Sequence, residues 1–268
     1  MKLSLTEEQT MIQDMACRFA ETILEPAATA LDRGDDKPAE RTLFLHNLKQ
    51  LAELGFMGLN VKSEYGGSDA GVVAFSLAIT EVARVCASTA VTMSVTNMVG
   101  EVIQAIASEE QKQRYLPKLC SGDYAAGGFC LSEAGVGSDP AGMKTSAVLE
   151  NNEWVLNGTK MWISSAEYAG IFVICAVTDP MAAKGKGISC FLVEAGTPGL
   201  IVGKAEEKMG QHGSATNTVI FDDCRIPKSA LMGELNDGFR IALSELSGGR
   251  IGIGSLALGI GQSAMDYA

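Results

Sequence analysis

The segment 129–139, Phe-Cys-Leu-Ser-Glu-Ala-Gly-Val-Gly-Ser-Asp, combines residue types that could bind a planar polar ring or a phosphate-bearing chain. Its strand-like start passes into small residues, among which Ser132 and Ser138 carry hydroxyls. Gly135 and Gly137 allow positive φ and let a ligand come close to several backbone N–H groups. Because most Gly-rich loops after a strand are only turns, this segment becomes a candidate binding site only together with a second element.

A second element follows at Lys160-Met161-Trp162-Ile163-Ser164. The indole of Trp162 offers a large flat apolar face against which a ring could lie. Ser164 comes two residues later in a predicted strand, so its hydroxyl should point to the same side as the indole. The alternative interpretation is a core tryptophan beside a surface serine.

Together, the two segments resemble the flavin-binding loops of the acyl-CoA dehydrogenase family, and the intervening Asn157-Gly158-Thr159-Lys160 is also typical of it. The resemblance covers essentially the whole chain, since further motifs occur in family order at Glu64-Tyr65-Gly66-Gly67, Ala87-Ser88-Thr89-Ala90, Lys208-Met209-Gly210 and Leu246 to Gly254. It implies that the cofactor is FAD, in contact with Phe129, Cys130, Leu131, Ser132, Gly137, Ser138, Trp162, Ile163 and Ser164.

The resemblance also implies substrate contacts, with Ser138 bonded to the CoA moiety and Ser247 and Arg250 on the substrate side. A fixed positive charge in a helix of small residues suits Arg250 to that role, and an ordinary surface arginine is the alternative. Three positions depart from the family pattern. Val136 replaces a small loop residue, His212 stands where Arg often follows Met-Gly, and Ser247 stands where Asp commonly precedes Gly-Gly-Arg.

The activity that the resemblance implies is α,β-dehydrogenation of an acyl-CoA thioester, with a short acyl chain favoured by the similarity over residues 250–254. This chemistry needs a general base. In most of the family the base is a glutamate in the C-terminal helical domain, beyond Ala268, and in a smaller subset it occupies the position of Gly249. Glu245, one helical turn earlier, is displaced too far to replace it. We therefore assign no catalytic residue, and we expect Glu133 to anchor the flavin loop.

Composition restricts the class of protein. With 268 residues, of which 47% are hydrophobic and 20% charged, the chain should be globular, and a net charge of −11 without a basic stripe argues against a nucleic-acid partner. No stretch is apolar enough for a membrane span. Seven scattered cysteines predict free thiols in the cytoplasm, and the isolated His46 and His212 predict no metal site. Glu81 and Glu101 are expected to be solvated helix charges.

The hydrophobic period changes twice, which divides the chain into three predicted domains. Residues 1–121 have helical spacing, with capping boxes beginning at Thr6 and Ser108; residues 122–232 have a period of two; residues 233–268 return to helical spacing. The predicted fold class is multi-domain α+β. It consists of an all-helical N-terminal domain, a middle antiparallel β-barrel or sandwich, and the beginning of a C-terminal helical bundle.

Two further structural expectations concern the β-domain and the last helix. Asn157-Gly158 is the strongest two-residue turn signal in the chain and predicts a hairpin between residues 153–156 and 159–163. The last helical run should pack on the first domain or on a partner, because a lone helix cannot bury its apolar face. Its apolar interior at residues 259–261 predicts that the polypeptide continues beyond Ala268.

The resemblance further implies an electron-transfer flavoprotein as the electron acceptor and a homotetramer as the assembly. Two alternatives stay open. One is a related acyl-CoA oxidase or flavin monooxygenase of the same fold, which sustained oxygen consumption with substrate would identify. The other is a shortened, non-catalytic subunit, which would be colourless and would associate with a longer homologue.

Overall fold

Helices form the first part of this computed structural model, which describes residues 4–33 and 37–268. Both predicted capping boxes are present, since Thr6 and Ser108 each accept a hydrogen bond from the backbone N–H three residues later. The helices are α1 (Glu7–Phe19), a π-helical turn (Ala20–Leu24), α2 (Glu25–Arg33), α3 (Lys37–Glu53), α4 (Gly71–Val85), α5 (Ala87–Ile106) and α6 (Glu109–Cys120), with 3-10 turns at Phe56–Gly58 and Ser63–Tyr65.

The middle of the chain forms one sheet. Its strands are β1 (Ala126–Cys130), β2 (Ser146–Glu150), β3 (Glu153–Ser164), β4 (Ala169–Val177), β5 (Ile188–Glu194), β6 (Leu200–Ala205), β7 (Thr216–Pro227) and β8 (Leu231–Met232), with 3-10 turns at Pro140–Gly142 and Lys228–Ala230. The order is β6-β7-β3-β2-β4-β5-β8, and β1 pairs with β4. The predicted β-domain is thus confirmed, with the addition that β1 and β2 run parallel to β4.

The predicted hairpin turn at Asn157-Gly158 is wrong, because both residues lie inside β3. Strand β7 pairs with β3 on both sides of the dipeptide, and a bulge between Leu156 and Gly158 takes up the irregularity. The turn lies earlier, between β2 and β3, where Asn151 and Asn152 have positive φ values of 48° and 69°. Two consecutive positive φ values are typical of a type I′ hairpin turn, and asparagine tolerates them.

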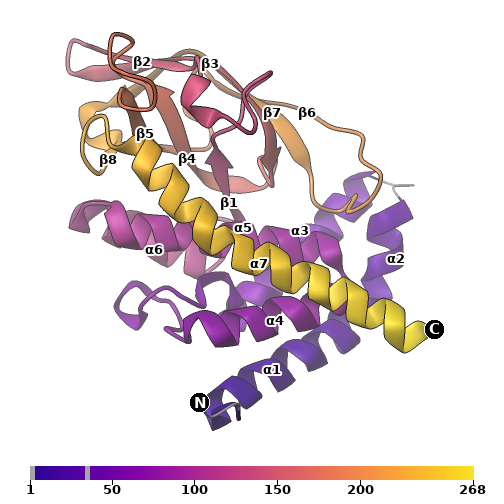
Figure 1. Cartoon of the computed structure of the whole chain (residues 1–268). Coiled ribbons are helices and arrows are strands. Elements are labelled where there is room, and N and C mark those ends of the chain that lie inside the picture. The colour runs from indigo at the N-terminus through magenta and orange to yellow at the C-terminus, as the bar shows by residue number, and fades with distance from the viewer. Residues whose placement is uncertain (1–3, 34–36) are drawn as a thin grey trace.

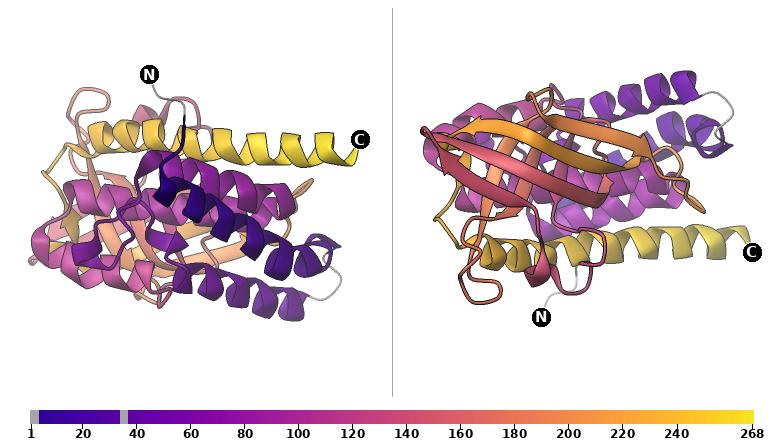
Figure 2. Two further views of the ribbon diagram at one scale, coloured as in Figure 1. Left: turned by 90° about the horizontal axis from the view of Figure 1, so that it is seen from below. Right: turned by 90° about the horizontal axis from the view of Figure 1, so that it is seen from above.

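Strand β4 lies between two of the apolar cores. Ile171 and Val173 pack with the helices and with β5, whereas Phe172 and Ile174 pack among the other strands of the sheet. This alternation follows from the period of two in a strand, and it allows both faces of β4 to be buried. Another core lies among α1 to α5. The sheet therefore rests on one side of the helical layer, as Figures 1 and 2 show.

The last helix, α7 (Gly238–Tyr267), packs along α4 and α5, as the sequence predicts, and crosses the helical layer in Figure 1. Glycines permit the close approach. A Cβ added at Gly252 would lie 2.1 Å from Oγ of Ser94, and one at Gly259 would lie 2.3 Å from the carbonyl oxygen of Thr80. Away from this contact α7 exposes large apolar side chains, namely Leu243, Ile251, Ile253, Leu258, Ile260, Met265 and Tyr267.

The predicted domain limits at 121/122 and 232/233 stay predictions. Their nearest element ends are Cys120 in α6 and Met232 in β8. Within the described residues, no helix has the length and the apolar character that crossing a membrane requires.

Candidate functional site

The structure places the two predicted flavin-binding segments side by side. The backbone N–H of Met161 donates a hydrogen bond to the carbonyl oxygen of Ser132 at 2.9 Å. Ser132 comes shortly after β1 ends, and Met161 lies near the end of β3. Segments that are distant in the sequence therefore form one surface.

Trp162 occupies that surface in an unusual backbone conformation. Its φ is +63°, a region that bulky residues rarely adopt, and the residue is 60% exposed. The cause is a bulge in the pairing of β3 with β7, between Lys160 and Ile163. After the bulge the strand alternates again, since Ile163 is buried and Ser164 is half-buried. Strain of this kind is retained mostly at functional sites, so the exposed indole is a candidate ligand-binding face.

A buried ion pair lies between the two segments. Nζ of Lys160 is 2.8 Å from Oε1 of Glu133, and the two side chains are 0% and 7% exposed. Burial by itself would raise the pKa of Glu133, but hydrogen bonds from Lys160 and Thr145 outweigh it, so the pKa is lowered. The anchoring role expected of Glu133 thus has a partner, Lys160, to which the sequence reasoning assigned no role.

Three serine hydroxyls in these segments have no hydrogen-bond partner among the described residues. They belong to Ser132 and Ser164, which are half-buried, and to Ser138, which is exposed. A Cβ added at Gly135 or Gly137 would meet no atom within 4 Å, so open space faces the loop backbone. Unused hydroxyls, accessible backbone and an exposed flat indole are what a planar ligand with polar edges requires.

Four other predicted flavin contacts are packing residues. Cys130 and Ile163 are 0% and 2% exposed in the core of the sheet, while Leu131 and Phe129 pack in the core next to the helices. Their side chains therefore help to fix the segments in place, and the half-buried Phe129 is the most accessible of the four. Burial also raises the pKa of the Cys130 thiol, which keeps it protonated.

Two of the three predicted substrate residues lie on a different element from Ser138, which belongs to the loop after β1. Ser247 and Arg250 are on an exposed part of α7, where Oγ of Ser247 donates to the carbonyl oxygen of Leu243 at 3.2 Å. Arg250 has no hydrogen-bond or ion-pair partner among the described residues. No described hydrogen bond or ion pair joins either residue to the flavin segments. A Cβ at Gly249, the base position of the family subset, would lie 2.8 Å from Sδ of Met98 in α5.

Three glutamates, on α4, α5 and α7, are more buried than the sequence predicts. Burial, assisted by the charge of Glu101, raises the pKa of Glu245 to about 8, and its Oε1 has no partner. Glu101 is itself half-buried, and burial raises its pKa although it accepts a hydrogen bond from Asn60 at 2.6 Å. Glu81 is only 7% exposed and pairs with Arg84. The solvated positions predicted for Glu81 and Glu101 are wrong, because helix packing, which no local pattern encodes, buries these faces.

His212, one of the three residues that depart from the family pattern, connects α2 to the β-domain. Nδ1 lies 2.7 Å from the carbonyl oxygen of Asp32 at the end of α2, and Nε2 lies 2.8 Å from that of Lys208. The Lys208 carbonyl, followed by the Asp32 carbonyl, raises the pKa of His212 because both favour a ring that donates from each nitrogen. The histidine thus has a structural role in this chain.

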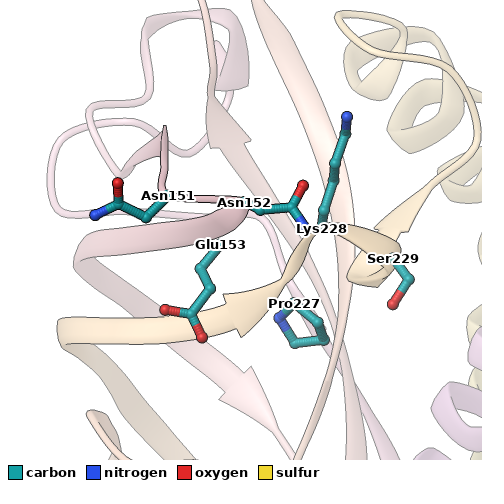
Figure 3. A pocket seen from close by; sticks show the side chains of 6 residues that line it. All are labelled: Asn151, Asn152, Glu153, Pro227, Lys228 and Ser229. Carbon is teal, nitrogen blue, oxygen red and sulfur yellow. The ribbon is translucent and has the colours of Figure 1, made fainter.

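A separate hollow opens at the other end of β3. It is lined by Asn151, Asn152, Glu153, Pro227, Lys228 and Ser229, which Figure 3 shows as sticks. Glu153 begins the strand on which Trp162 lies near the end, so this hollow is not part of the surface formed by the two flavin segments.

Comparison with protein families yields two matches that follow one another along the chain. Residues 6–123 match the acyl-CoA dehydrogenase N-terminal domain, and residues 128–224 match the acyl-CoA dehydrogenase middle domain.

Curated relatives match nearly the whole chain. The acryloyl-CoA reductase (NADH) of Anaerotignum propionicum is 43% identical over 100% of this chain and 66% of its own length. The acyl-CoA dehydrogenase of Bacillus subtilis is 40% identical over 99% of this chain and 68% of its own length. The short-chain specific acyl-CoA dehydrogenase of Homo sapiens is 44% identical over 99% of this chain and 63% of its own length. The chain thus spans about two thirds of the length of these relatives.

Solved structures share the fold. Butyryl-CoA dehydrogenase from Megasphaera elsdenii superposes with a TM-score of 0.92 at 35% identity, over 99% of this chain and 69% of that one. A chain of the structure described as the electron transferring flavoprotein of Acidaminococcus fermentans gives 0.93 at 38% identity, over 99% and 68%. An acyl-CoA dehydrogenase complexed with FAD from Bacillus anthracis gives 0.86 at 32% identity, over 96% and 42%. On these matches, the chain belongs to the acyl-CoA dehydrogenase family.

Proposed function

We propose that this chain forms the flavin-binding part of an enzyme that dehydrogenates short-chain acyl-CoA thioesters between the α- and β-carbons. The observation that carries the proposal is the hydrogen bond from Met161 to Ser132, which seats the exposed Trp162 beside a loop of unpartnered hydroxyls. Short-chain specificity is supported by the 44% identity to a short-chain enzyme.

The residues present fit FAD. Trp162 would cover one face of the ring system, while Ser132 and Ser164 would donate to or accept from its polar edge. The open backbone around Gly137, with the hydroxyl of Ser138, would accommodate the more distant polar groups. When bound, FAD supplies the acceptor for the hydride that leaves the β-carbon.

The chain's own residues would bind substrate through Ser138, Ser247 and Arg250. Arg250 offers an unpaired fixed charge, which suits an anionic CoA group. We assign removal of the proton from the α-carbon to a glutamate. We place this glutamate in the part of the relatives' length that this chain does not span. Gly249 has no side chain that could accept it, and no described contact places Glu245 near the flavin segments.

The electron acceptor and the oligomeric state are part of the same proposal. We extend the proposal to an electron-transfer flavoprotein as acceptor and a homotetramer as assembly, and family membership supports both. All seven cysteines are free thiols, which fits a reducing compartment such as the cytoplasm. The identity to an acryloyl-CoA reductase also makes the reverse reaction, reduction of a short 2-enoyl thioester, a second candidate function.

Replacement of Trp162 by alanine tests the proposal. The wild-type chain should bind FAD and shift the visible flavin absorption, and W162A should bind it about tenfold or more weakly, because a stacking face is lost. The matched control is W154F, since Trp154 is buried in the sheet core. Equal FAD affinity and an unchanged flavin spectrum in W162A would contradict the assigned ring position.

The alternatives are discriminated in a version of the chain extended by the part of the relatives' length that it does not span, because that part would supply the assigned base. In this version, decolourisation of bound flavin by butyryl-CoA without sustained oxygen uptake supports the dehydrogenase, and sustained uptake indicates an oxidase or monooxygenase. A wild-type chain that binds no FAD but associates with a longer homologue would indicate a non-catalytic subunit.

A further inference from the structure

Lys160 is completely buried, although lysine is among the residues that proteins bury least. Its ammonium group has three neighbours that can accept its protons. They are the carbonyl oxygen of Leu131 at 3.1 Å, Oε1 of Glu133 at 2.8 Å and Sδ of Met143 at 3.7 Å. All three lie in the segment that connects β1 to β2, whereas Lys160 lies in β3. The lysine therefore ties that segment to the strand.

Glu133 extends the connection to the other end of the same segment. Its Oε2 accepts a hydrogen bond from the backbone N–H of Lys144 at 2.7 Å, and its Oε1 accepts one from that of Thr145 at 3.0 Å. One carboxylate thus gathers the beginning of the loop, its end and β3. The ion pair is fully hydrogen-bonded, which is the condition under which burying two charges is tolerated.

Few other contacts hold this loop. Residues 134, 135 and 137–139 are exposed, so they contribute little apolar packing. The remaining described ties are the packing of Leu131 and Met143 near its two ends, the hydrogen bond from the backbone N–H of Val177 to the carbonyl oxygen of Thr145 at 2.8 Å, short-range turn bonds, the Met161–Ser132 bond and a surface ion pair between Asp139 and Lys184. Without the buried pair, the loop would keep one backbone bond to β3.

We propose that Lys160 is a positioning residue for the flavin, an inference that rests on the function proposed above. Its ammonium holds the loop with Ser132 and Ser138 at a fixed place relative to the β3 bulge that carries Trp162. Only Met161 lies between Lys160 and Trp162 in the sequence, so the loop is fixed directly beside the strained indole. The ion pair therefore holds both flavin segments in one arrangement before any ligand binds. Less conformational entropy is then lost when the ligand binds.

The test measures the mobility of Trp162 without ligand and the affinity of the chain for FAD. In a W154F background, Trp162 is the remaining tryptophan, so its fluorescence anisotropy reports the mobility of the bulge. K160M keeps the length of the side chain and removes its charge. We expect lower anisotropy for Trp162 without FAD and FAD affinity reduced about tenfold or more, as for loss of one hydrogen bond to a charged group.

The double variant K160M/E133Q separates positioning from stability. It leaves no unpaired buried charge, so its thermal stability should recover relative to K160M, while Trp162 mobility and weak FAD binding should persist. The matched control is L48A in α3, which lowers stability in the helical core far from the loop. L48A should leave both the anisotropy of Trp162 and the FAD affinity unchanged at a temperature where it is folded.

Two results would overturn the inference. One is that K160M has the same Trp162 anisotropy and the same FAD affinity as the chain with Lys160. The other is recovery of both properties in the double variant, which would make the pair a stability device only. A wild-type chain that binds no FAD would contradict the proposed function, and the anisotropy of Trp162 would still decide the role of Lys160.

Discussion

At the scale of single residues, the candidate site reverses the usual distribution of side chains. Lys160 is fully buried while Trp162, two positions later in the same strand, is 60% exposed. A bulge between Lys160 and Ile163, which contains Trp162, changes the direction of the side chains, and an ion pair compensates the buried charge. Each departure costs free energy on its own. Their coincidence at one place is the physical reason to treat this surface as functional.

Glu245 is a second residue in an unfavourable environment, and its effect on stability can be measured. Its pKa of about 8 lies above the value of about 4.3 in an unfolded chain. The folded state therefore holds a proton that the unfolded state has lost, so the free energy of unfolding should fall by about 1.4 kcal/mol per unit as pH rises between these values. Glu101 contributes in the same direction, since its pKa is also raised.

Urea unfolding of E245Q at several pH values tests this expectation. The difference between wild type and variant should grow in favour of the variant from mildly acidic pH to about pH 8. S244A, at an exposed position of the same helix without an ionisable side chain, is the control and should give a difference that does not change with pH. A difference between wild type and E245Q that does not change with pH would show that Glu245 ionises normally.

At the scale of the elements, β3 connects the site to the rest of the β-domain. The strand pairs with β2 and β7 and carries Lys160, Trp162 and Ser164 near its end. Gly158 allows β3 to continue past the bulge between Leu156 and Gly158. The φ of Gly158 is +147°, and an added Cβ would lie 2.6 Å from Oγ1 of Thr145. The alignment of the candidate site thus depends on a glycine in the interior of the strand.

Replacement of Gly158 by alanine should therefore destabilise the chain by about 1–3 kcal/mol, from crowding against Thr145 and backbone strain. Thermal or urea unfolding measures the loss. G210A is the matched control, because a Cβ there meets no atom within 4 Å and its φ is not positive. Equal stability of the two variants would mean that β3 can shift at this point without cost.

At the scale of the whole molecule, polar contacts join the helical layer to the β-domain. Arg41 in α3 pairs with Glu167 at 2.9 Å, and His212 bonds the end of α2. Thr92 in α5 lies 3.0 Å from the hydroxyl of Ser165, directly after β3, and 3.1 Å from that of Ser214. The orientation of the site relative to the helices depends on these contacts.

The His212 contact should make this junction sensitive to pH. Because its folded-state pKa is raised, its stabilising contribution is present below the unfolded value of about 6.5 and is lost as pH rises through the folded value. The thermal midpoint of wild type should therefore exceed that of H212Q by more at about pH 6 than at about pH 9. S244A, at an exposed position without an ionisable side chain, is the control and should show no such trend. A constant gap between wild type and H212Q would refute this role.

What the sequence determined by itself was local or motif-based. The capping boxes at Thr6 and Ser108 depend on contacts within three residues, so their helices begin where predicted. The paired motifs around Ser132 and Trp162 sufficed for the family, since each motif is short and contiguous. The division into helical and β parts also follows from short-range periodicity.

Tertiary structure alone decided which local preference prevailed and which charges were buried. Asn157-Gly158 has the stronger turn preference, yet the pairing of β7 along β3 outweighs it and moves the turn to Asn151-Asn152. The partnership of Lys160 with Glu133 and the burial of Glu245 depend in the same way on elements distant in the sequence. Their free energies arise only when those elements pack, so no local window of residues contains them.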